Sequence, residues 1–393
     1  MKLKLVLLLV VVSFGVGALN YQGPPKKVDW KDLSKNLEGL ENIPDEVKFD
    51  DQIFTVNNTL NSGLQKYLKL LLRRYRTPYA SIVVIDNNNG EIIGALGRNF
   101  KTREVSPRFS FTNSHPAASL FKIVSAGALI ENFDFDENTL FSYNGKGTTL
   151  YKYQLKDRKN RWTRTIPLKR AFAYSNNVIF GKLGIKYLNE DDISSMASKF
   201  GFGRKITQTF KLGKSELMPI KDEYDLAEIS SGFNRQTKIS PVHAAYMSYL
   251  IVNEGKASPL KLIKSYENNF GKKVKQSPKK PVRQLSKKTS QGLKKMMTET
   301  TRRGTASKSF RKIRYRMRKN LVYGAKTGSI TGGKPYGRHE WVTAFAHPKK
   351  NLSDKGISVA VLNVVKDRWY IRSGYLAKKV IEYYYRNNKA RLR

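Results

Sequence analysis

A serine and a lysine stand three residues apart in an otherwise apolar run, "PAASLFKIVSAGALIE", residues 116–131. On a helix, this spacing brings the Lys122 amine to the same face as the Ser119 hydroxyl. A neighbouring base can activate a serine as a nucleophile, and a lysine is such a base only when it is uncharged. Its pKa must then fall by about three units from 10.4, roughly 4 kcal/mol, through burial or a second cation. The apolar neighbours favour burial, so the pair predicts nucleophile and base.

The same Ser-x-x-Lys pattern also begins at Ser258, Ser277 and Ser309, as chance allows in a chain with 73 Lys and Arg residues. Proline follows the first two serines directly, and the third lies in a polybasic run. Only Ser119 has the apolar helical surroundings that the chemistry requires. The other three serines are therefore interpreted as surface residues.

A second polar group interrupts an apolar helical pattern in "AFAYSNNVIFGKLG". Ser175, Asn176 and Asn177 are three consecutive polar residues, which interior helices rarely contain without a reason. A simpler interpretation is the N-cap of the following helix. The context must decide between a cap and a reactive site.

A third group lies in "YGAKTGSITGG", where Lys-Thr-Gly occurs for the only time in the chain. Lys326, Thr327 and Ser329 offer a cation and two hydroxyls, and Gly328 permits close backbone approach. On an edge strand, such residues can hold a carboxylate and a peptide that lies alongside as an extra strand. The alternative is an ordinary glycine turn.

The elements that position these residues are visible in the apolar patterns. Two β-rich runs, 81–85 and 91–96, flank the turn Asn-Asn-Asn-Gly and predict a hairpin. Further strands are expected in "EWVTAFAHP" and "GISVAVLNVV". From Leu60 onward, apolar residues recur at helical spacing at Leu64, Leu68 and Leu71. Further helical patterns cover 116–131, 166–189 and 240–253, and a final amphipathic helix is expected around Leu376, Val380 and Tyr384. This order predicts an α+β fold, a mostly antiparallel sheet of N- and C-terminal strands flanked by helices, with an inserted helical subdomain.

The N-terminus predicts export. Lys2 and Lys4 precede an apolar run that closes with Val16-Gly17-Ala18, so residues 1–18 are expected to be a signal peptide or, alternatively, an uncleaved anchor. Residues 19–51 are interpreted as an irregular lead-in and 52–393 as the main domain. The absence of cysteine excludes disulfides and cysteine-liganded metals.

The formal net charge of +42 favours an anionic partner, although a merely solvated lysine-rich surface is an equally open interpretation. Export argues against nucleic acid and for cell-wall polymer or anionic lipid. Residues 272–320 hold 19 Lys or Arg and one acid, Glu299. The alternation in "RKIRYRMRKN" predicts a strand there with one basic face.

The three motifs in this order resemble those of the penicillin-binding proteins and serine β-lactamases. The similarity extends to "VIDNNNGEIIGALG", "GFNRQTKISPVHAAYMSYLIVNEG" and "RRGTA", and covers roughly residues 52–390. It implies D,D-transpeptidase or carboxypeptidase activity on D-alanyl-D-alanine stem peptides of peptidoglycan, inhibition by β-lactams, and no cofactor or metal.

The resemblance also implies a role for each matching residue. Ser119 would be the acylated nucleophile and Lys122 its base. Ser175 would relay a proton to the leaving group, and Lys326 would hold Ser175 and Lys122 electrostatically. The substrate would be bound by Asn177 at its amide and by Thr327 and the Ser329 hydroxyl at its carboxylate, with Gly328 between them also in the binding segment. The Ser119 and Ser329 amides would form the oxyanion hole.

Two alternatives remain at this stage. A β-lactamase of the same fold needs a fast deacylating base, and in one class that base lies in a Glu-x-x-Leu-Asn pattern, which is absent between Asn177 and Lys326. A non-catalytic wall-binding or regulatory homologue would retain the fold alone. Zinc chemistry is not expected, because "HEWVT" has Thr343 where a second histidine is needed. The four histidines are interpreted as surface or core residues.

Overall fold

The structure is a computed structural model that describes residues 28–35, 43–207, 214–277, 279–351, 353–366 and 370–392. At its centre lies a six-stranded sheet in which every neighbouring pair is antiparallel. In spatial order its strands are β14 (Leu321–Thr331), β15 (Arg338–Pro348), β16 (Ile357–Val365), β3 (Tyr79–Asp86), β4 (Glu91–Asn99) and β5 (Glu104–Ser106). N- and C-terminal strands therefore share one sheet, as predicted.

The central strands are apolar on both sides because both faces of the sheet are covered. Along β3, Val83 and Ile85 enter one hydrophobic core while Ile82 and Val84 enter the other. This is the period-2 alternation of a strand between two layers. The predicted hairpin is confirmed: β3 and β4 pair around a turn that Gly90 closes with a φ of +71°.

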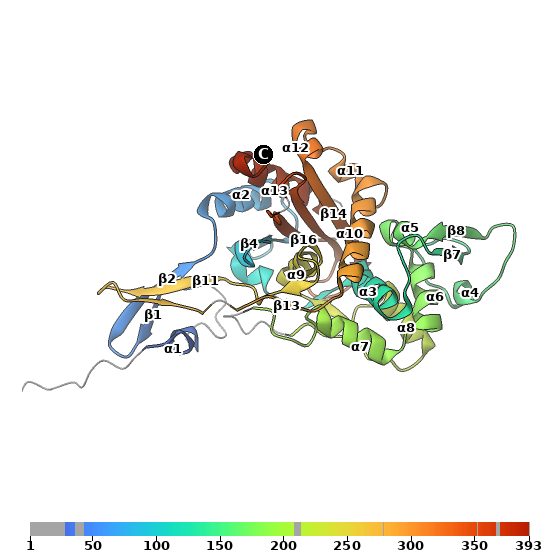
Figure 1. Ribbon diagram of the computed structural model, residues 1–393, viewed down its shortest axis with the longest axis horizontal. Coiled ribbons are helices and arrows are strands. Elements are labelled where there is room, and N and C mark those ends of the chain that lie inside the picture. Colours follow the sequence, from blue (N-terminus) through green and yellow to red (C-terminus); the bar gives the residue numbers. More distant parts are fainter. Residues whose placement is uncertain are drawn as a thin grey trace, which may run out of the picture.

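Helices form the outer layers (Figure 1). The first core contains residues of α3 (Lys122–Phe133), α9 (Pro241–Val252) and α10 (Lys287–Arg302). The second contains residues of α2 (Ser62–Arg74), α11 (Ser307–Phe310), α12 (Tyr315–Asn320) and α13 (Ser373–Asn387). The predicted helices at 116–131, 166–189 and 240–253 are confirmed, the second as two helices.

The inserted helical subdomain lies beside the edge strand β14 (Figure 1). It contains α5 (Leu168–Ala173), α6 (Asn177–Tyr187), α7 (Glu190–Lys199) and α8 (Glu223–Ser231). At its outer end the hairpin β7 (Leu140–Tyr143) and β8 (Arg164–Pro167) encloses the one-turn helix α4 (Lys152–Leu155). Shorter elements connect these parts: η1 (Pro107–Ser110), η2 (Ala118–Phe121), the pair β6 (His115–Pro116) and β9 (Lys238–Ile239), and the pair β10 (Lys256–Ala257) and β13 (Val282–Arg283).

The expectation of an irregular segment over 19–51 is wrong for its described part. Residues Trp30–Lys35 form α1 and Glu46–Phe49 form β1, which joins a second sheet with β2 (Gln52–Asn58), β11 (Ile263–Asn268) and β12 (Lys273–Lys275). Trp30 and Leu33 are buried there in a small core with Phe54 and Tyr266. Ile263 and Tyr266 of this core lie more than 200 residues further along the chain, so local periodicity could not show it.

The basic segment 272–320 is not a single surface. It runs from the β11–β12 hairpin on the left of Figure 1 through β13 and α10 near the centre to α11 and α12 at the top. The predicted basic strand is wrong, because Tyr315–Asn320 is the helix α12. Some of the charges are paired locally, as in the ion pair of Lys295 with Glu137 at 2.6 Å.

The predicted signal segment, residues 1–18, lies outside the described residues. Within the part of the chain that the structure describes, no helix has both the length and the apolar character to cross a bilayer.

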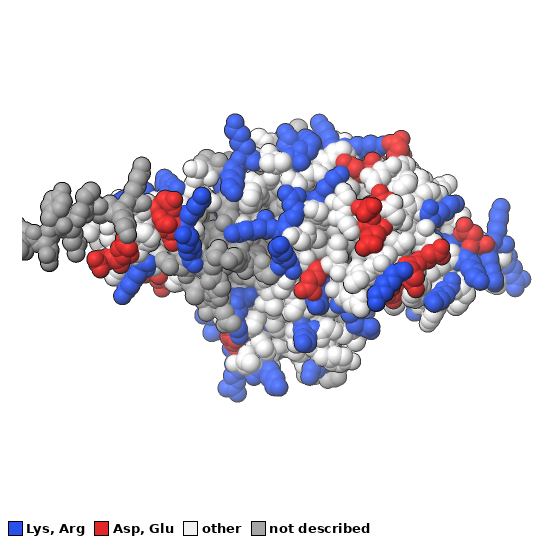
Figure 2. Space-filling model, turned by 90° about the horizontal axis from the view of Figure 1, so that it is seen from below, with Lys and Arg blue, Asp and Glu red and all other residues white. Residues whose placement is uncertain are grey.

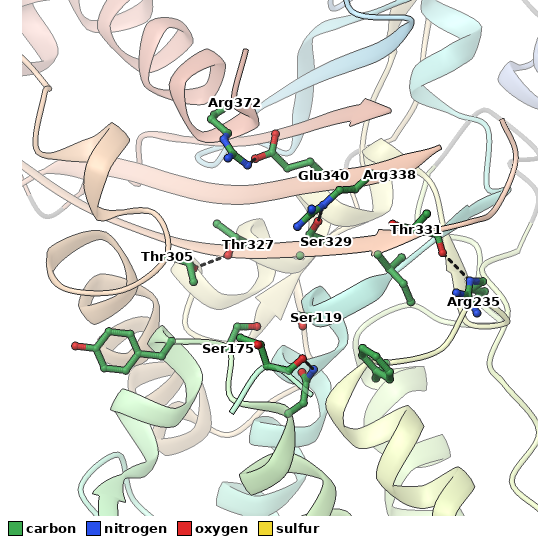
Figure 3. A pocket seen from close by; sticks show the side chains of 17 residues that line it. Ser119, Ser175, Arg235, Thr305, Thr327, Ser329, Thr331, Arg338, Glu340 and Arg372 are labelled. Atoms are coloured by element: carbon green, nitrogen blue, oxygen red, sulfur yellow. Dashed lines mark hydrogen bonds and ion pairs between the residues drawn. The ribbon is translucent and has the colours of Figure 1, made fainter. Parts of the chain in front are cut away.

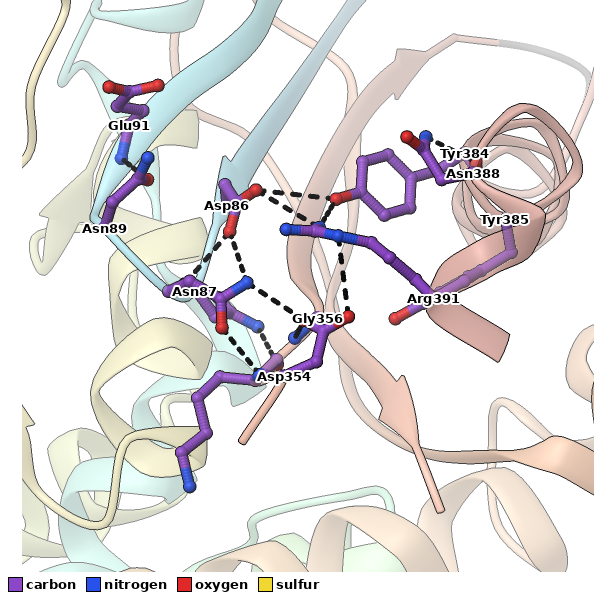
Figure 4. Close-up of polar contacts among 12 residues, drawn as sticks. Asp86, Asn87, Asn89, Glu91, Asp354, Gly356, Tyr384, Tyr385, Asn388 and Arg391 are labelled. Carbon is purple, nitrogen blue, oxygen red and sulfur yellow. Dashed lines mark hydrogen bonds and ion pairs between the residues drawn. The ribbon is translucent and has the colours of Figure 1, made fainter. Parts of the chain in front are cut away.

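The C-terminal residues are fastened to the β3–β4 turn by charge pairs (Figure 4). Arg391, in the last turn η3 (Lys389–Leu392), pairs with Asp86 at 3.2 Å and with Asp354 at 3.5 Å. The Asp354 carboxylate also accepts from the backbone amide of Gly356 at 2.8 Å. These contacts attach the C-terminal turn to the end of β3 and to the β15–β16 loop.

Candidate active site

A cleft of about 640 Å³ opens between the edge strand β14 and the helical subdomain. Its lining includes the polar groups singled out in the sequence, drawn together in Figure 3. They are Ser119, Ser175, Asn177, Thr327, Gly328 and Ser329. Lys122 and Lys326 lie behind them, fully buried. The three motifs are thus adjacent in space although they are about 50 and 150 residues apart in sequence.

Ser119 is held on a tight turn at the start of a helix. It belongs to η2, and α3 begins at Lys122. The preceding Ala118 has a φ of +50°, a conformation that is strained for a residue with a side chain. Gly232 stabilises this turn by contact, since a Cβ on it would lie 2.1 Å from the Ala118 carbonyl oxygen. This strained turn directs Ser119 into the cleft.

The Lys122 amine has three hydrogen-bond partners. Its Nζ lies 3.0 Å from Ser119 Oγ, 2.7 Å from Asn177 Oδ1 and 2.5 Å from the Ser231 carbonyl oxygen. Burial, followed by the nearby positive charge of Lys326, lowers its pKa well below the usual value. A neutral amine has two N–H groups and one lone pair. The two carbonyl oxygens can accept both protons, so the lone pair is left for the Ser119 hydroxyl.

Lys326 forms a second buried lysine–serine pair. Its Nζ donates to Ser175 Oγ at 2.9 Å and to the Thr327 carbonyl oxygen at 2.7 Å. Burial lowers the pKa of Lys326 to about 7. Ser175 has a φ of +56°, so it too is held in a strained conformation. The loop that carries it lies between α5 and α6.

Both interpretations of the Ser175 motif hold, for different residues. Asn176 is the N-cap of α6, and its side chain accepts from the Ile179 amide at 3.0 Å. Asn177 instead points to the cleft: its Oδ1 accepts from Lys122 and its Nδ2 donates to the Thr148 carbonyl oxygen at 2.8 Å. The loop at Thr148 therefore forms part of the same wall.

The Lys-Thr-Gly segment lies on β14, which is the last strand of its sheet. Gly328 allows β14 to approach Ser119 closely, because a Cβ there would lie 3.2 Å from the Ser119 amide nitrogen. The Thr327 hydroxyl pairs with that of Thr305, and the Ser329 hydroxyl accepts from Arg338 Nε at 2.8 Å. An edge strand of this kind can pair with an extended peptide in the cleft.

Sequence reasoning missed three arginines that line the far part of the cleft. Arg235 Nε donates to the Thr331 carbonyl oxygen at 2.6 Å, and Arg372 lies 3.4 Å from the carboxylate of Glu340. Together with Arg338 they make this part of the cleft basic (Figure 3). In a chain with 73 Lys and Arg residues, no local signal distinguishes them. Thr305, by contrast, lies in the "RRGTA" segment that supported the family resemblance.

The remaining sequence candidates lie outside the cleft. Ser258 is buried, so its interpretation as a surface residue is wrong, while Ser277 is exposed as expected. All four histidines are buried. Among the described residues, no group of three or more side chains is arranged to hold a metal ion.

Comparison with known proteins decides the family. The model of the penicillin-binding protein transpeptidase domain matches residues 80–367, which is most of the chain. The chain belongs to this transpeptidase family. A comparison of the sequence with curated proteins finds no match. The recognition made from the three motifs is thus confirmed at the level of the family.

Solved structures of transpeptidase-family proteins share the fold. The D,D-transpeptidase domain of a peptidoglycan glycosyltransferase from Eggerthella lenta is 21% identical, with a TM-score of 0.67 over 86% of this chain and 84% of that one. Penicillin-binding protein 3 of Mycobacterium tuberculosis is 16% identical, with a TM-score of 0.70 over 86% and 81%. Penicillin-binding protein A of Mycobacterium tuberculosis, in an imipenem acyl-enzyme complex, is 18% identical, with a TM-score of 0.66 over 84% and 79%.

Proposed function

We propose that this transpeptidase-family chain is a serine D,D-acyltransferase that acts on D-alanyl-D-alanine stem peptides of peptidoglycan through an acyl-enzyme on Ser119. One observation carries the proposal: Ser119 and Ser175 each contact a fully buried lysine, Lys122 and Lys326, beside an edge strand that can bind an extended peptide. Burial lowers the pKa of both amines, that of Lys326 to about 7, so each serine contacts an amine that can lose its proton.

Acylation follows from this geometry. The peptide lies along β14, with its terminal carboxylate at the Thr327 and Ser329 hydroxyls and the scissile carbonyl oxygen between the amides of Ser119 and Ser329. Neutral Lys122 takes the Ser119 proton as Oγ attacks the carbonyl carbon. Ser175 donates its proton to the departing amine of the last D-alanine and is reprotonated by the Lys326 ammonium.

Deacylation restores the protons. An incoming amine of a neighbouring stem peptide, or water, attacks the ester and gives its proton to Lys326 through Ser175. Lys122 then returns its proton to Ser119 Oγ as the acyl group leaves. A β-lactam would acylate Ser119 by the same first step, in keeping with the imipenem acyl-enzyme of the structurally similar penicillin-binding protein A.

The cleft favours slow hydrolysis of such an adduct over the rapid turnover of a β-lactamase. Among its described lining residues the only carboxylate is that of Glu340. This carboxylate accepts from the Ser373 amide at 2.9 Å and from the Ser373 hydroxyl at 3.1 Å, and it pairs with Arg372. It is therefore engaged in structural contacts and is poorly placed to activate a water.

Intact-mass spectrometry of the protein with benzylpenicillin tests the proposal, with Ser119→Ala as the matched control. A stable adduct on the wild type alone is expected. Rapid return to free protein with consumption of the drug would instead indicate a β-lactamase. The absence of any adduct at saturating drug would contradict catalysis and favour a non-catalytic homologue.

We further propose that the protein acts outside the cytoplasm, on the basis of the charged and apolar pattern of residues 1–18. We also propose that residues 272–320 add non-specific adhesion to anionic wall polymer or lipid through their 19 basic residues. Pelleting with purified sacculi at low and high salt tests the second point. Binding that does not weaken as salt increases would contradict it.

A further inference from the structure

An outlying part of the helical subdomain exposes large aromatic side chains. Residues 138–167, here called the outer hairpin unit, comprise β7, α4, β8 and the loops between them, at the end of the molecule opposite α1 (Figure 1). In this unit Tyr151 is 54% exposed, Tyr153 64% and Trp162 67%. Exposed aromatic groups at this density are unusual on a protein surface with no partner.

Each of the three aromatic rings has a neighbour over one face and remains mostly exposed to solvent. Tyr151 and Tyr153 are nearly parallel, with ring centroids 5.6 Å apart and an interplanar angle of 9°. The Arg161 guanidinium lies 4.7 Å from the centroid of the Trp162 ring. Flat ring faces combined with cations suit a partner that has both apolar surfaces and negative charge.

The outer hairpin unit is also strongly basic. It contains seven Lys or Arg residues and one acid, Asp157, whose carboxylate pairs with Lys182 of α6 at 2.6 Å. In the view from below, Lys and Arg side chains gather at this end of the molecule (Figure 2). The charge is complementary to a polyanion.

The unit is continuous with the wall of the cleft. Thr148 lines the cleft, and its carbonyl oxygen holds Asn177. Within the same loop, Gln154 Oε1 accepts from the Thr149 hydroxyl at 2.9 Å and from the Tyr151 amide at 3.0 Å. The exposed aromatic surface therefore begins three residues from the cleft and is fixed to it by hydrogen bonds.

We propose that the outer hairpin unit binds the glycan strand to which the stem peptide is attached. This proposal rests on the proposed function, since a peptide in the cleft brings its own polymer across the adjacent surface. The C–H faces of sugar rings pack against Tyr151, Tyr153 and Trp162, and the basic side chains face the carboxylates of neighbouring stem peptides. A membrane interface would also accept aromatic and basic residues. The continuity with the cleft favours the substrate strand.

Two substrates separate the surface from the chemistry: un-cross-linked glycan strands that carry pentapeptides, and the free pentapeptide. For the full chain with Tyr153→Ala and Trp162→Ala combined, kcat/KM on the strands is expected to fall about tenfold while turnover of the free peptide is unchanged. Both side chains are mostly exposed, so folding should be unaffected. Phe270→Ala is the matched control, because it removes an 87% exposed aromatic residue next to the β11–β12 hairpin, in the other sheet.

Each outcome has a defined meaning. If the ratio of kcat/KM on the strands to kcat/KM on the free peptide were equal in the wild type and the double variant, the inference would be overturned. It would also be overturned if Phe270→Ala lowered kcat/KM on the strands by as much as the double variant does. If the double variant lost binding to vesicles of anionic phospholipid but turned over the strands as the wild type does, the inference would be overturned in favour of a membrane surface. Failure of the wild type to form a penicillin adduct would instead overturn the proposed function. The two proposals can therefore fail separately.

Discussion

The cleft and the β3–β4 turn each hold a cluster of ionisable side chains, and the two clusters differ in whether a cation is paired with a carboxylate. At the cleft, the Lys122 and Lys326 amines are fully buried, and neither forms an ion pair with any residue that the structure describes. At the β3–β4 turn, Arg391 lies between the carboxylates of Asp86 and Asp354 (Figure 4). The amines of the first cluster have no carboxylate partner among the described residues, while the arginine of the second has two.

The difference indicates what each cluster is for. An unpaired buried amine loses its proton readily, because burial disfavours the charged form. Burial of an unpaired amine lowers the stability of the fold but makes the amine reactive, and such groups are typical of active sites. A paired arginine cannot change its protonation state and contributes through attraction alone. Changes at the cleft should therefore alter rate more than stability, and changes at the turn should do the reverse.

The largest effect is expected for Lys122→Met, which keeps most of the side-chain volume but removes the amine that we propose as the base. The acylation rate with benzylpenicillin should fall by about 10³-fold or more, roughly 4 kcal/mol in the barrier. The free energy of unfolding should change by less than about 1 kcal/mol, since relief from burying the amine offsets the three lost hydrogen bonds. Stopped-flow acylation and urea unfolding measure the two quantities. A variant that acylates at the wild-type rate would show that Lys122 is not the base.

A pH-dependent stability should come from Lys326. Its pKa is about 7 in the fold, where burial lowers it, and near 10.4 in the unfolded chain. Between these values the unfolded state binds more protons, so stability rises with pH. The increase from this group should be about 2 kcal/mol from pH 7 to pH 9.

Lys326→Met isolates this contribution. Unfolding by urea at several pH values, for the wild type and the variant, should give a difference that grows with pH over this range. Parallel pH profiles for the two proteins would mean that Lys326 keeps its proton in the fold.

A smaller effect on rate is expected for Gly328→Ala. The added Cβ would lie 3.2 Å from the Ser119 amide, so β14 must shift by a few tenths of an ångström. Displacement of the Ser119 and Ser329 amides, the proposed oxyanion donors, should slow acylation about tenfold. The measurement is the acylation rate, with Gly63→Ala in α2 as control, because a Cβ at Gly63 would meet the Tyr383 hydroxyl oxygen at an ordinary contact distance of 3.4 Å. An unchanged rate would place the developing oxyanion elsewhere.

The smallest effect is expected for Arg391→Met. Removal of both ion pairs at the turn should lower the free energy of unfolding by about 1 kcal/mol, because the pairs are partly exposed. The acylation rate should stay within twofold of the wild type. Thermal unfolding and penicillin acylation of the same preparation test both statements. A marked loss of acylation would show that the turn also affects the reaction rate, against the expectation that it affects stability alone.

Local patterns in the sequence were enough to predict the main fold. The hairpin of β3 and β4 follows from two β-rich runs around one turn, and α9 from a continuous apolar segment bounded by Pro241. Each of these signals lies within about 20 residues. The Lys-Thr-Gly segment was recognisable for a similar reason, since the motif occurs once.

Signals that depend on distant residues were not visible. The small core around Trp30 needs Tyr266, and the basic end of the cleft needs Arg235, Arg338 and Arg372 from three separate elements. In isolation each of these arginines is one basic residue among many. The strand predicted in the basic segment failed because alternation in "RKIRYRMRKN" reflects a single turn and a short helix, where Met317 alone is buried in the helix.

By itself, the sequence determined which residues could react, because a helix with Ser119 and Lys122 three positions apart brings them together locally. The tertiary structure decided the rest. It buried Lys122 under α8, placed Lys326 behind Ser175 from a strand 151 residues away, and joined the outer hairpin unit to the cleft through Asn177. The pKa of an amine depends on everything packed around it, and packing between distant segments is not written in any local pattern.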